Sequence, residues 1–251
     1  MGLNKTKVLG INVTTNSRVE ILEEIKKRLA ESGKRKGKPL VIVTPNPEQI
    51  VLAQKDKHLA DILNRADVAI PDGIGLALVM RLKRIPGVEL MEDVVAIAAK
   101  EGYRVGLIGG WHGVALKALE CLQKKYPRLN RGWTAVPEDV HLKEYLKDTR
   151  IVFVGLGAPK QEYFIDSLSF RPPSRNPGRK TWIPDQVRDD NKNIVLMAVG
   201  GSFDILAGRI PRAPMVLRTI GLEWLWRLIV EPWRWRRQMA LVKFFWLVMT
   251  A

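Results

Sequence analysis

The chain has 251 residues, of which 46% are hydrophobic and 27% charged, a balance that excludes wholesale disorder and suits one large globular domain or a domain with an appendage. Its formal net charge of +15 at pH 7 is unusually high and favours polyanionic partners: nucleic acid, an anionic membrane surface or phosphorylated substrates. The single cysteine, Cys121, excludes an internal disulfide framework and fits a reducing compartment.

Strands and helices alternate along the first 208 residues. The predicted strands cover residues 7–14, 39–46, 67–73, 103–110, 149–157 and 193–201. The predicted helices cover residues 17–32, 47–66, 74–84 and 112–126. The strands are apolar runs without polar alternation, which is typical of a parallel sheet with both faces covered. We therefore expect an open, Rossmann-like α/β domain over residues 1–208, with helices on both faces of its sheet.

The segment 169–193 interrupts this alternation. It contains four prolines and scattered charges, and its apolar residues follow no helical period. These features predict an exposed insertion between a helix and the last strand.

The C-terminal segment, residues 209–251, has a composition of its own. It contains eight Lys or Arg, two acidic residues and five of the eight tryptophans of the chain. Residues 221–231 are expected to form one helix, and Pro232 can begin a second. Arginine and tryptophan beside an apolar face are typical of a helix in a membrane interface, so we expect a helical membrane-docking appendage. The alternative is a helix that packs on its own domain or on a second subunit.

The sequence lacks the marks of a secreted or membrane-spanning chain. The N-terminal residues have no apolar core of the length that a secretory signal needs. No uninterrupted apolar stretch reaches the roughly 18–20 residues of a bilayer-spanning helix. We expect a cytoplasmic protein whose contact with a membrane is peripheral.

Polar residues and glycines gather at the predicted carboxyl ends of the strands, where open parallel sheets bind their ligands. These motifs cover residues 44–46, 71–75, 109–110, 155–162 and 200–204. Glycines let backbone N–H groups approach a phosphate, so Gly109 and Gly110 are candidate binding residues. Lys160 and Gln161 begin the helix after residue 159, where they can contact a sugar or a diphosphate. Their alternative role is an ordinary exposed first turn.

Asp72 and Arg84 are the candidates for chemistry. Asp72 follows an apolar strand and a proline, which favours a carboxylate at the cleft edge that serves as a general base. An Asp-Gly turn explains the same residues equally well. Arg84 is available to hold a phosphate, although a solvated charge at a helix end is the simpler interpretation.

No metal-binding pattern is evident. The three histidines are far apart and lack Cys or carboxylate neighbours at ligand spacing, and the chain has no Asp-x-Asp. We therefore expect neither a metal nor a cofactor. A departing diphosphate would then be stabilised by arginine side chains and backbone dipoles.

Six motifs occur in order between about residue 8 and residue 245. They read TPNPEQIVLAQKD, ADVAIPDGIGL, RIPGVEL, VGLGAPKQE, AVGGSFDILAGRIPRAP and GLEWLWRLIVEPWRWRRQMAL. Together they resemble the WecG/TagA/CpsF glycosyltransferases, glycosyltransferase family 26. The stretch between Asp72 and RIPG is a few residues shorter than is usual in the family, and the insertion at 169–193 is foreign to it.

The resemblance implies a bacterial enzyme that transfers N-acetylmannosamine, or its uronic acid, from a UDP donor. The implied acceptor is N-acetylglucosamine on undecaprenyl diphosphate at the cytoplasmic face of the membrane. The implied product is a β-linked disaccharide formed with inversion, a step in the synthesis of a cell-wall or surface polysaccharide. An anionic membrane surface is therefore an implied partner, and nucleic acid is not.

The resemblance also assigns roles by position. It implies that Asp72 is the general base that deprotonates the acceptor hydroxyl, and that Arg84 stabilises the departing UDP. The residues that it places along the sugar-binding cleft are Thr44, Asn46 and Gln161. The residues that it assigns to the lipid diphosphate are Arg227, Arg234 and Arg237.

Three alternative functions remain open at this point. A nucleic-acid binder explains the positive charge but not the ordered strand-end motifs. A nicotinamide-dependent oxidoreductase requires a full glycine fingerprint followed by an acidic residue about 20 positions later, which the chain lacks. A catalytically impaired, membrane-associated family member is expected if the insertion abolishes activity. The number of subunits is also open, and the sequence is compatible with a homo-oligomer.

Overall fold

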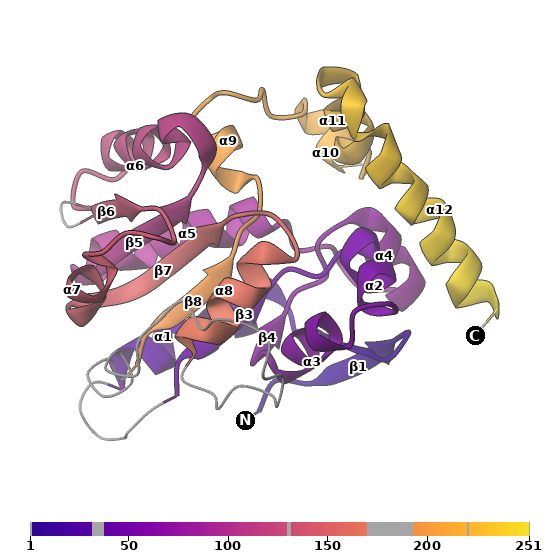
Figure 1. The fold of residues 1–251 in the computed structure, drawn as a ribbon, viewed down its shortest axis with the longest axis horizontal. Coiled ribbons are helices and arrows are strands. Elements are labelled where there is room, and N and C mark those ends of the chain that lie inside the picture. Colours follow the sequence, from indigo (N-terminus) through magenta and orange to yellow (C-terminus); the bar gives the residue numbers. More distant parts are fainter. Residues whose placement is uncertain (1, 32–37, 130–131, 170–192, 220, 251) are drawn as a thin grey trace.

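The computed structural model describes residues 2–31, 38–129, 132–169, 193–219 and 221–250 (Figure 1). Apart from its two end residues, the predicted insertion at 169–193 lies outside the described residues. Within the described part of the chain, six strands form a parallel sheet in the order β4-β3-β8-β7-β5-β6. The strands are β3 (Leu40–Val43), β4 (Val68–Ala69), β5 (Arg104–Gly109), β6 (Gly132–Ala135), β7 (Thr149–Gly155) and β8 (Val195–Ala198).

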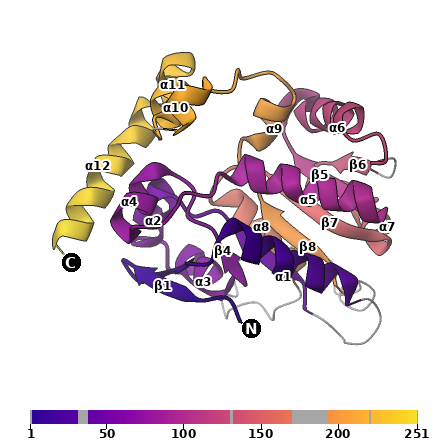
Figure 2. The same cartoon turned by 180° about the vertical axis from the view of Figure 1, so that it is seen from behind.

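Helices cover both faces of this sheet, which confirms the predicted Rossmann-like α/β class. One face carries α1 (Arg18–Ala30), α5 (Gly87–Glu101), α6 (Val114–Lys125) and α9 (Ser202–Leu206), and Figure 2 shows α1 and α5 in front of the sheet. The other face carries α2 (Pro47–Ala53), α3 (Lys57–Arg65), α7 (Leu142–Lys147) and α8 (Lys160–Leu168). Alternate residues of each strand enter the two cores: Ile42 packs with the first set of helices and Val43 with the second. Both faces are therefore apolar, as the unbroken hydrophobic runs predict.

Local signals in the sequence determine where α1 begins and which of its faces is buried. Ser17 accepts a hydrogen bond from the Glu20 backbone N–H, and the Glu20 carboxylate accepts one from the Ser17 N–H, so the two form a capping box. Ile21, Ile25 and Leu29 follow at intervals of four residues and are buried. The cap sets where α1 begins, and the spacing sets which face it turns towards the sheet.

Three predicted elements differ from the structure. The predicted strand 7–14 is a hairpin of β1 (Lys5–Val8) and β2 (Ile11–Thr14), which forms a separate two-stranded sheet. Leu9 and Gly10 both have positive φ, at 48° and 79°, as a tight two-residue hairpin turn requires. The predicted helix 47–66 is divided into α2 and α3 because the Asp56 side chain caps a new helix by accepting from Leu59 N–H at 3.1 Å.

The third difference concerns the predicted helix 74–84. Helix α4 (Ile74–Met80) is shorter than expected, because Arg81 adopts the left-handed conformation with φ 53° and ends it. The Leu82 N–H then donates to Ala77 O, and the Ile85 N–H donates to Pro71 O at 3.2 Å. Arg84 therefore lies on a loop that returns to the end of β4, and not on a helix.

The described residues of the C-terminal segment form three helices. They are α10 (Met215–Thr219), α11 (Glu223–Val230) and α12 (Trp235–Thr250), with a 3-10 turn, η3 (Pro232–Arg234), before the last. Helix α12 runs along α2 and α4 (Figure 1), where its Phe244 side chain is fully buried. Gly75 of α4 permits this approach, since a β-carbon there would lie 2.6 Å from Leu241 Cδ1. No helix in the described ranges is both long and apolar enough to cross a bilayer.

Candidate active site

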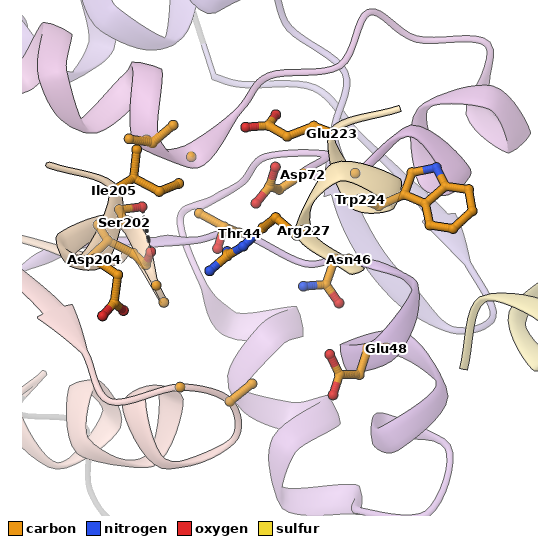
Figure 3. Close-up of a pocket in the computed structure, with 18 of the residues that line it drawn as sticks. Thr44, Asn46, Glu48, Asp72, Ser202, Asp204, Ile205, Glu223, Trp224 and Arg227 are labelled. Atoms are coloured by element: carbon orange, nitrogen blue, oxygen red, sulfur yellow. Dashed lines mark hydrogen bonds between the residues drawn. The ribbon is translucent and has the colours of Figure 1, made fainter. Parts of the chain in front are cut away.

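A cleft of about 740 Å³ opens at the carboxyl ends of the strands, and α11 forms part of its wall. Residues from all five strand-end motifs line it, together with Glu223, Trp224 and Arg227 of α11 (Figure 3). The chain thus brings together residues that are up to 197 positions apart, from Thr44 to Leu241. This is where open parallel sheets bind ligands.

Thr44 and Asn46 follow β3 and form one side of the cleft. Thr44 is buried with 6% of its surface exposed. Asn46 caps α2: its Oδ1 accepts from the Gln49 N–H at 3.0 Å, and Pro47 occupies the first turn, where a missing N–H costs little. The cap fixes the Asn46 side chain at the cleft, with its amide facing the open space (Figure 3).

Asp72 lies at the floor of the cleft, at the end of β4. Its backbone N–H donates to Pro45 O at 3.1 Å, which ties the turn to the neighbouring strand end. Gly87, the first residue of α5, leaves room for the carboxylate, since a β-carbon there would lie 3.3 Å from Thr44 Cγ2 and 3.6 Å from Asp72 Oδ2. A small residue at this position lets the positive end of α5 approach Asp72.

The surroundings of Asp72 raise its pKa above the ordinary value. Burial is the main cause: 31% of the side chain is accessible, but that surface opens onto the cleft, whose walls limit solvation. The negative charge of Glu223 also raises the pKa, whereas Arg84, the Gly87 N–H and Arg227 lower it. A carboxylate with a raised pKa is a stronger base, as proton abstraction from a hydroxyl requires.

Arg84 lies beside Asp72, with 17% of its side chain exposed. Its Nη2 donates to Glu223 Oε2 at 2.6 Å and lies 3.9 Å from Asp72 Oδ1. The short loop after α4 therefore places the arginine beside Asp72. Its Nε is buried without a hydrogen-bond partner in the described part of the chain.

The two glycines at the end of β5 differ in their position relative to the cleft. Gly110 lines the cleft, and Gly109 does not. Gly109 packs behind the cleft wall, where a β-carbon would lie 2.7 Å from Gly155 O. Both have positive φ, at 101° and 74°, so glycine is required at each by backbone conformation. Trp111 follows them and lies at the cleft with 76% of its surface exposed.

A buried network holds Gln161 in place. Its Oε1 accepts from the Gly200 N–H at 3.0 Å, and its Nε2 donates to Glu162 Oε1 at 2.7 Å. Gln49 Nε2 donates to the same Glu162 oxygen at 3.1 Å. Burial raises the pKa of Glu162 to about 6, although these amide donors and its own N–H favour the charged form. Lys160, the preceding residue, is exposed and is not part of the cleft wall.

The three arginines assigned to the lipid diphosphate differ in what the structure describes. Arg227 lines the cleft: its Nη2 lies 3.1 Å from Glu231 Oε2, and its guanidinium rests against Gly201. Arg234 ends η3 and Arg237 lies within α12, but their side chains lie outside the described part of the structure. Glu231, with φ −127° and ψ 72°, separates α11 from the turn that holds Arg234.

The described residues contain no group of three or more His, Cys, Asp or Glu that could hold a metal ion. Metal independence stays a prediction of the sequence.

The sequence of this chain can be compared with those of known proteins. The sequence pattern of the Glycosyl transferase WecG/TagA/CpsF family matches residues 6–251. The chain belongs to this family. The N-acetylglucosaminyldiphosphoundecaprenol N-acetyl-beta-D-mannosaminyltransferase of Bacillus subtilis (strain 168) is 30% identical over 215 residues, which cover 81% of this chain and 77% of that protein. The enzyme of the same name from Staphylococcus aureus (strain NCTC 8325 / PS 47) is 29% identical over 244 residues, covering 93% and 86%.

Membership of the WecG/TagA/CpsF family confirms the resemblance and makes this chain a glycosyltransferase by family. Three further residues at or near the cleft were not singled out from the sequence. Glu223 pairs with Arg84, Glu162 orients Gln161, and Asp204 of α9 lines the cleft. Asp204 and Glu162 belong to strand-end motifs, although neither was singled out within them. Glu223 lies in the C-terminal segment, and its partner Arg84 is distant in sequence.

Proposed function

We propose that this protein is an inverting glycosyltransferase that moves an N-acetylmannosamine-type sugar from a UDP donor to N-acetylglucosamine on undecaprenyl diphosphate. The observation that carries this proposal is the Asp72–Arg84 pair at the floor of a strand-end cleft in a member of this family. The two named relatives, each about three quarters or more covered by the alignment, bear the name of that reaction. The product would serve cell-wall or surface polysaccharide synthesis.

In this mechanism Asp72 accepts the proton of the acceptor hydroxyl as its oxygen attacks the anomeric carbon of the donor. The bond between that carbon and the diphosphate breaks on the opposite side, and UDP leaves with the electron pair. Attack from one side and departure from the other inverts the configuration. Arg84 presents its guanidinium to the charge that develops on the diphosphate, whereas the Gly110 and Gly200 N–H groups already donate to Gly155 O and Gln161 Oε1. Thr44, Asn46 and Gln161 would contact the sugar.

The C-terminal helices would bring the enzyme to its lipid acceptor. Trp233, Trp235, Met239, Val242 and Trp246 each expose more than half of their surface. The segment also has an excess of basic residues, each worth roughly 1 kcal/mol near an anionic surface. Indole rings and cations on one segment suit the headgroup region of a bilayer, so we place the protein at the inner face of the cell membrane. Arg227, Arg234 and Arg237 would then hold the lipid diphosphate.

A transfer assay tests the reaction. The full chain is mixed with UDP-N-acetylmannosamine and a lipid-diphosphate N-acetylglucosamine analogue in EDTA, and UDP release is measured for the wild type and Asp72→Asn. We expect metal-independent release by the wild type and a loss of about 100-fold or more in the variant, as for removal of a general base. Equal rates from both proteins would refute the role of Asp72. A folded wild type that binds the acceptor analogue but releases no UDP would favour the catalytically impaired alternative.

Sedimentation with vesicles tests the membrane contact. We expect binding to vesicles of anionic phosphatidylglycerol, little binding to neutral phosphatidylcholine, and weaker binding as salt increases. Trp246→Asp, on the exposed side of α12, should weaken binding. The control is His141→Asp, which adds the same charge at an exposed position just before α7. Equal binding to both vesicle types would refute the electrostatic part of the proposal.

A further inference from the structure

A carboxylate from the C-terminal segment reaches the centre of the cleft. Glu223 is the first residue of α11, and only 11% of its side chain is exposed. Its Oε2 accepts from Arg84 Nη2 at 2.6 Å, across 139 positions of sequence. The same Nη2 lies 3.9 Å from Asp72 Oδ1, so one guanidinium nitrogen stands between two carboxylates and is closer to Glu223.

We propose that Glu223 is a positioning residue of the transfer reaction, whose carboxylate holds the Arg84 guanidinium away from Asp72 and so leaves Asp72 free to accept a proton. This inference rests on the proposed function, in which Asp72 is the general base. It assigns to the C-terminal segment a part in the chemistry itself, in addition to any contact with the lipid.

The distances carry this inference. A charge-assisted hydrogen bond forms at about 2.7–2.9 Å, so the Arg84–Glu223 contact is fully formed and the 3.9 Å approach to Asp72 is not. Without the Glu223 carboxylate, a side-chain rotation would let Arg84 pair directly with Asp72. That pairing would occupy the carboxylate oxygen that must receive the proton, and it would stabilise the charged form of Asp72.

The charges around Asp72 support the same conclusion. The groups that face it are Arg84 from the loop after α4, Glu223 and Arg227 from α11, and the Gly87 N–H at the start of α5. Glu223 is the acidic member of this set and raises the pKa of Asp72, whereas Arg84, the Gly87 N–H and Arg227 lower it. Replacing Glu223 by a neutral residue would leave the cationic groups without this opposing charge, and Asp72 would become a weaker base.

Three variants of the full chain test the inference: Glu223→Gln, Glu223→Asp and, as a control, Glu101→Gln at the exposed end of α5. For Glu223→Gln we expect kcat to fall about 10-fold to 100-fold, a part of the effect of a general base, with KM for the UDP-sugar within about threefold. The acid limb of the rate against pH should move to lower pH, because the pKa of Asp72 falls. Glu223→Asp keeps the charge and should recover most of kcat, and Glu101→Gln should match the wild type.

A carbon-13 NMR titration of the aspartate carboxyl groups tests the coupling without turnover, with the Asp72 signal assigned from Asp72→Asn. We expect Glu223→Gln to lower the pKa of Asp72. If the titration moves while the wild type transfers no sugar from this donor, the inference holds and the proposed reaction fails. An unmoved titration in a folded Glu223→Gln protein would overturn the inference. So would a rise in kcat with a lower KM, since Glu223 would then compete with the diphosphate for Arg84. If Glu223→Gln does not fold, the comparison of Glu223→Asp with the wild type decides: an unchanged pH profile with a lower melting temperature would mean a purely structural role.

Discussion

Glu162 gives the sharpest test of the electrostatics of the cleft, because it is a fully buried carboxylate behind Gln161. Its pKa is raised from the ordinary 4.5 to about 6 by burial. Between these two values the folded protein keeps the proton that the unfolded chain has released. The contribution of Glu162 to stability is therefore fully present below pH 4.5 and is lost as the pH rises through 6.

The size of this loss follows from the shift. A difference of about 1.5 pKa units, at about 1.4 kcal/mol per unit, lowers the free energy of unfolding by about 2 kcal/mol between pH 4.5 and pH 7. Glu162→Gln has no titrating group and keeps an oxygen that can accept from Gln161 and Gln49. The free energy of unfolding of Glu162→Gln should therefore not show this decrease between pH 4.5 and pH 7. Asp72, whose pKa is also raised, contributes equally to both proteins and cancels in the comparison.

Urea unfolding at a series of pH values measures the effect. We expect the stability difference between the wild type and Glu162→Gln to change by about 2 kcal/mol in favour of the variant from pH 4.5 to pH 7. Glu101→Gln, which removes a carboxylate from an exposed helix end, should show no such change. Parallel pH profiles for the wild type and Glu162→Gln would refute the reasoning, since Glu162 would then titrate alike in the folded and unfolded states.

Three further predictions concern packing. Gly75→Ala places a β-carbon 2.6 Å from Leu241 Cδ1, so the Leu241 side chain must leave its present packing on α4, and the amides of α12 should exchange hydrogen faster than those of the wild type. Phe244→Ala empties a site with no solvent exposure, and the cost of about 3–5 kcal/mol should appear first as release of α12, measured by the same exchange. Trp133→Phe removes the 2.8 Å hydrogen bond from the indole to Thr149 and should lower the free energy of unfolding by about 1 kcal/mol, measured by urea unfolding.

Each of these three predictions can be refuted by a specific result. Gly2→Ala, which has open space around it, is a size control for Gly75→Ala; faster exchange of the α12 amides in that variant as well would argue against the specific contact with Leu241. Exchange in α12 that Phe244→Ala leaves unaltered would mean that the helix is held elsewhere. A Trp133→Phe protein as stable as the wild type would mean that the indole N–H contributes nothing.

Much of the sheet domain could be predicted from the sequence, for a physical reason. Strands buried on both faces must be apolar at every position, and this leaves runs such as residues 40–43 and 151–154 that few other structures tolerate. The strand-end motifs follow directly from the strands. The hairpin at residues 5–14 was missed because its turn, Leu9-Gly10, lacks the Asn or Asp that usually marks such turns.

The proposed catalytic centre was only half predictable. Asp72 and Arg84 could be found because they lie within motifs, but their 3.9 Å separation depends on Arg81, a non-glycine residue in the left-handed conformation that ends α4 early. Glu223 lies within the sixth motif, but nothing in the sequence pointed to its contact with Arg84. Its neighbours are leucine and tryptophan, so it resembles the polar face of an amphipathic helix, and only tertiary folding brings it to Arg84.

The order of the strands also has a consequence for how the protein is made. β8 is the last strand of the sheet to be synthesised, yet it lies between β3 and β7. Until about residue 198 has left the ribosome, both of those strands present an unpaired edge, which is apolar at residues 40–43 and 151–154. The nascent chain therefore carries one such edge from about residue 43 and two from about residue 155 until β8 is made, so the yield of folded enzyme in the cell should depend on protection of these edges during synthesis.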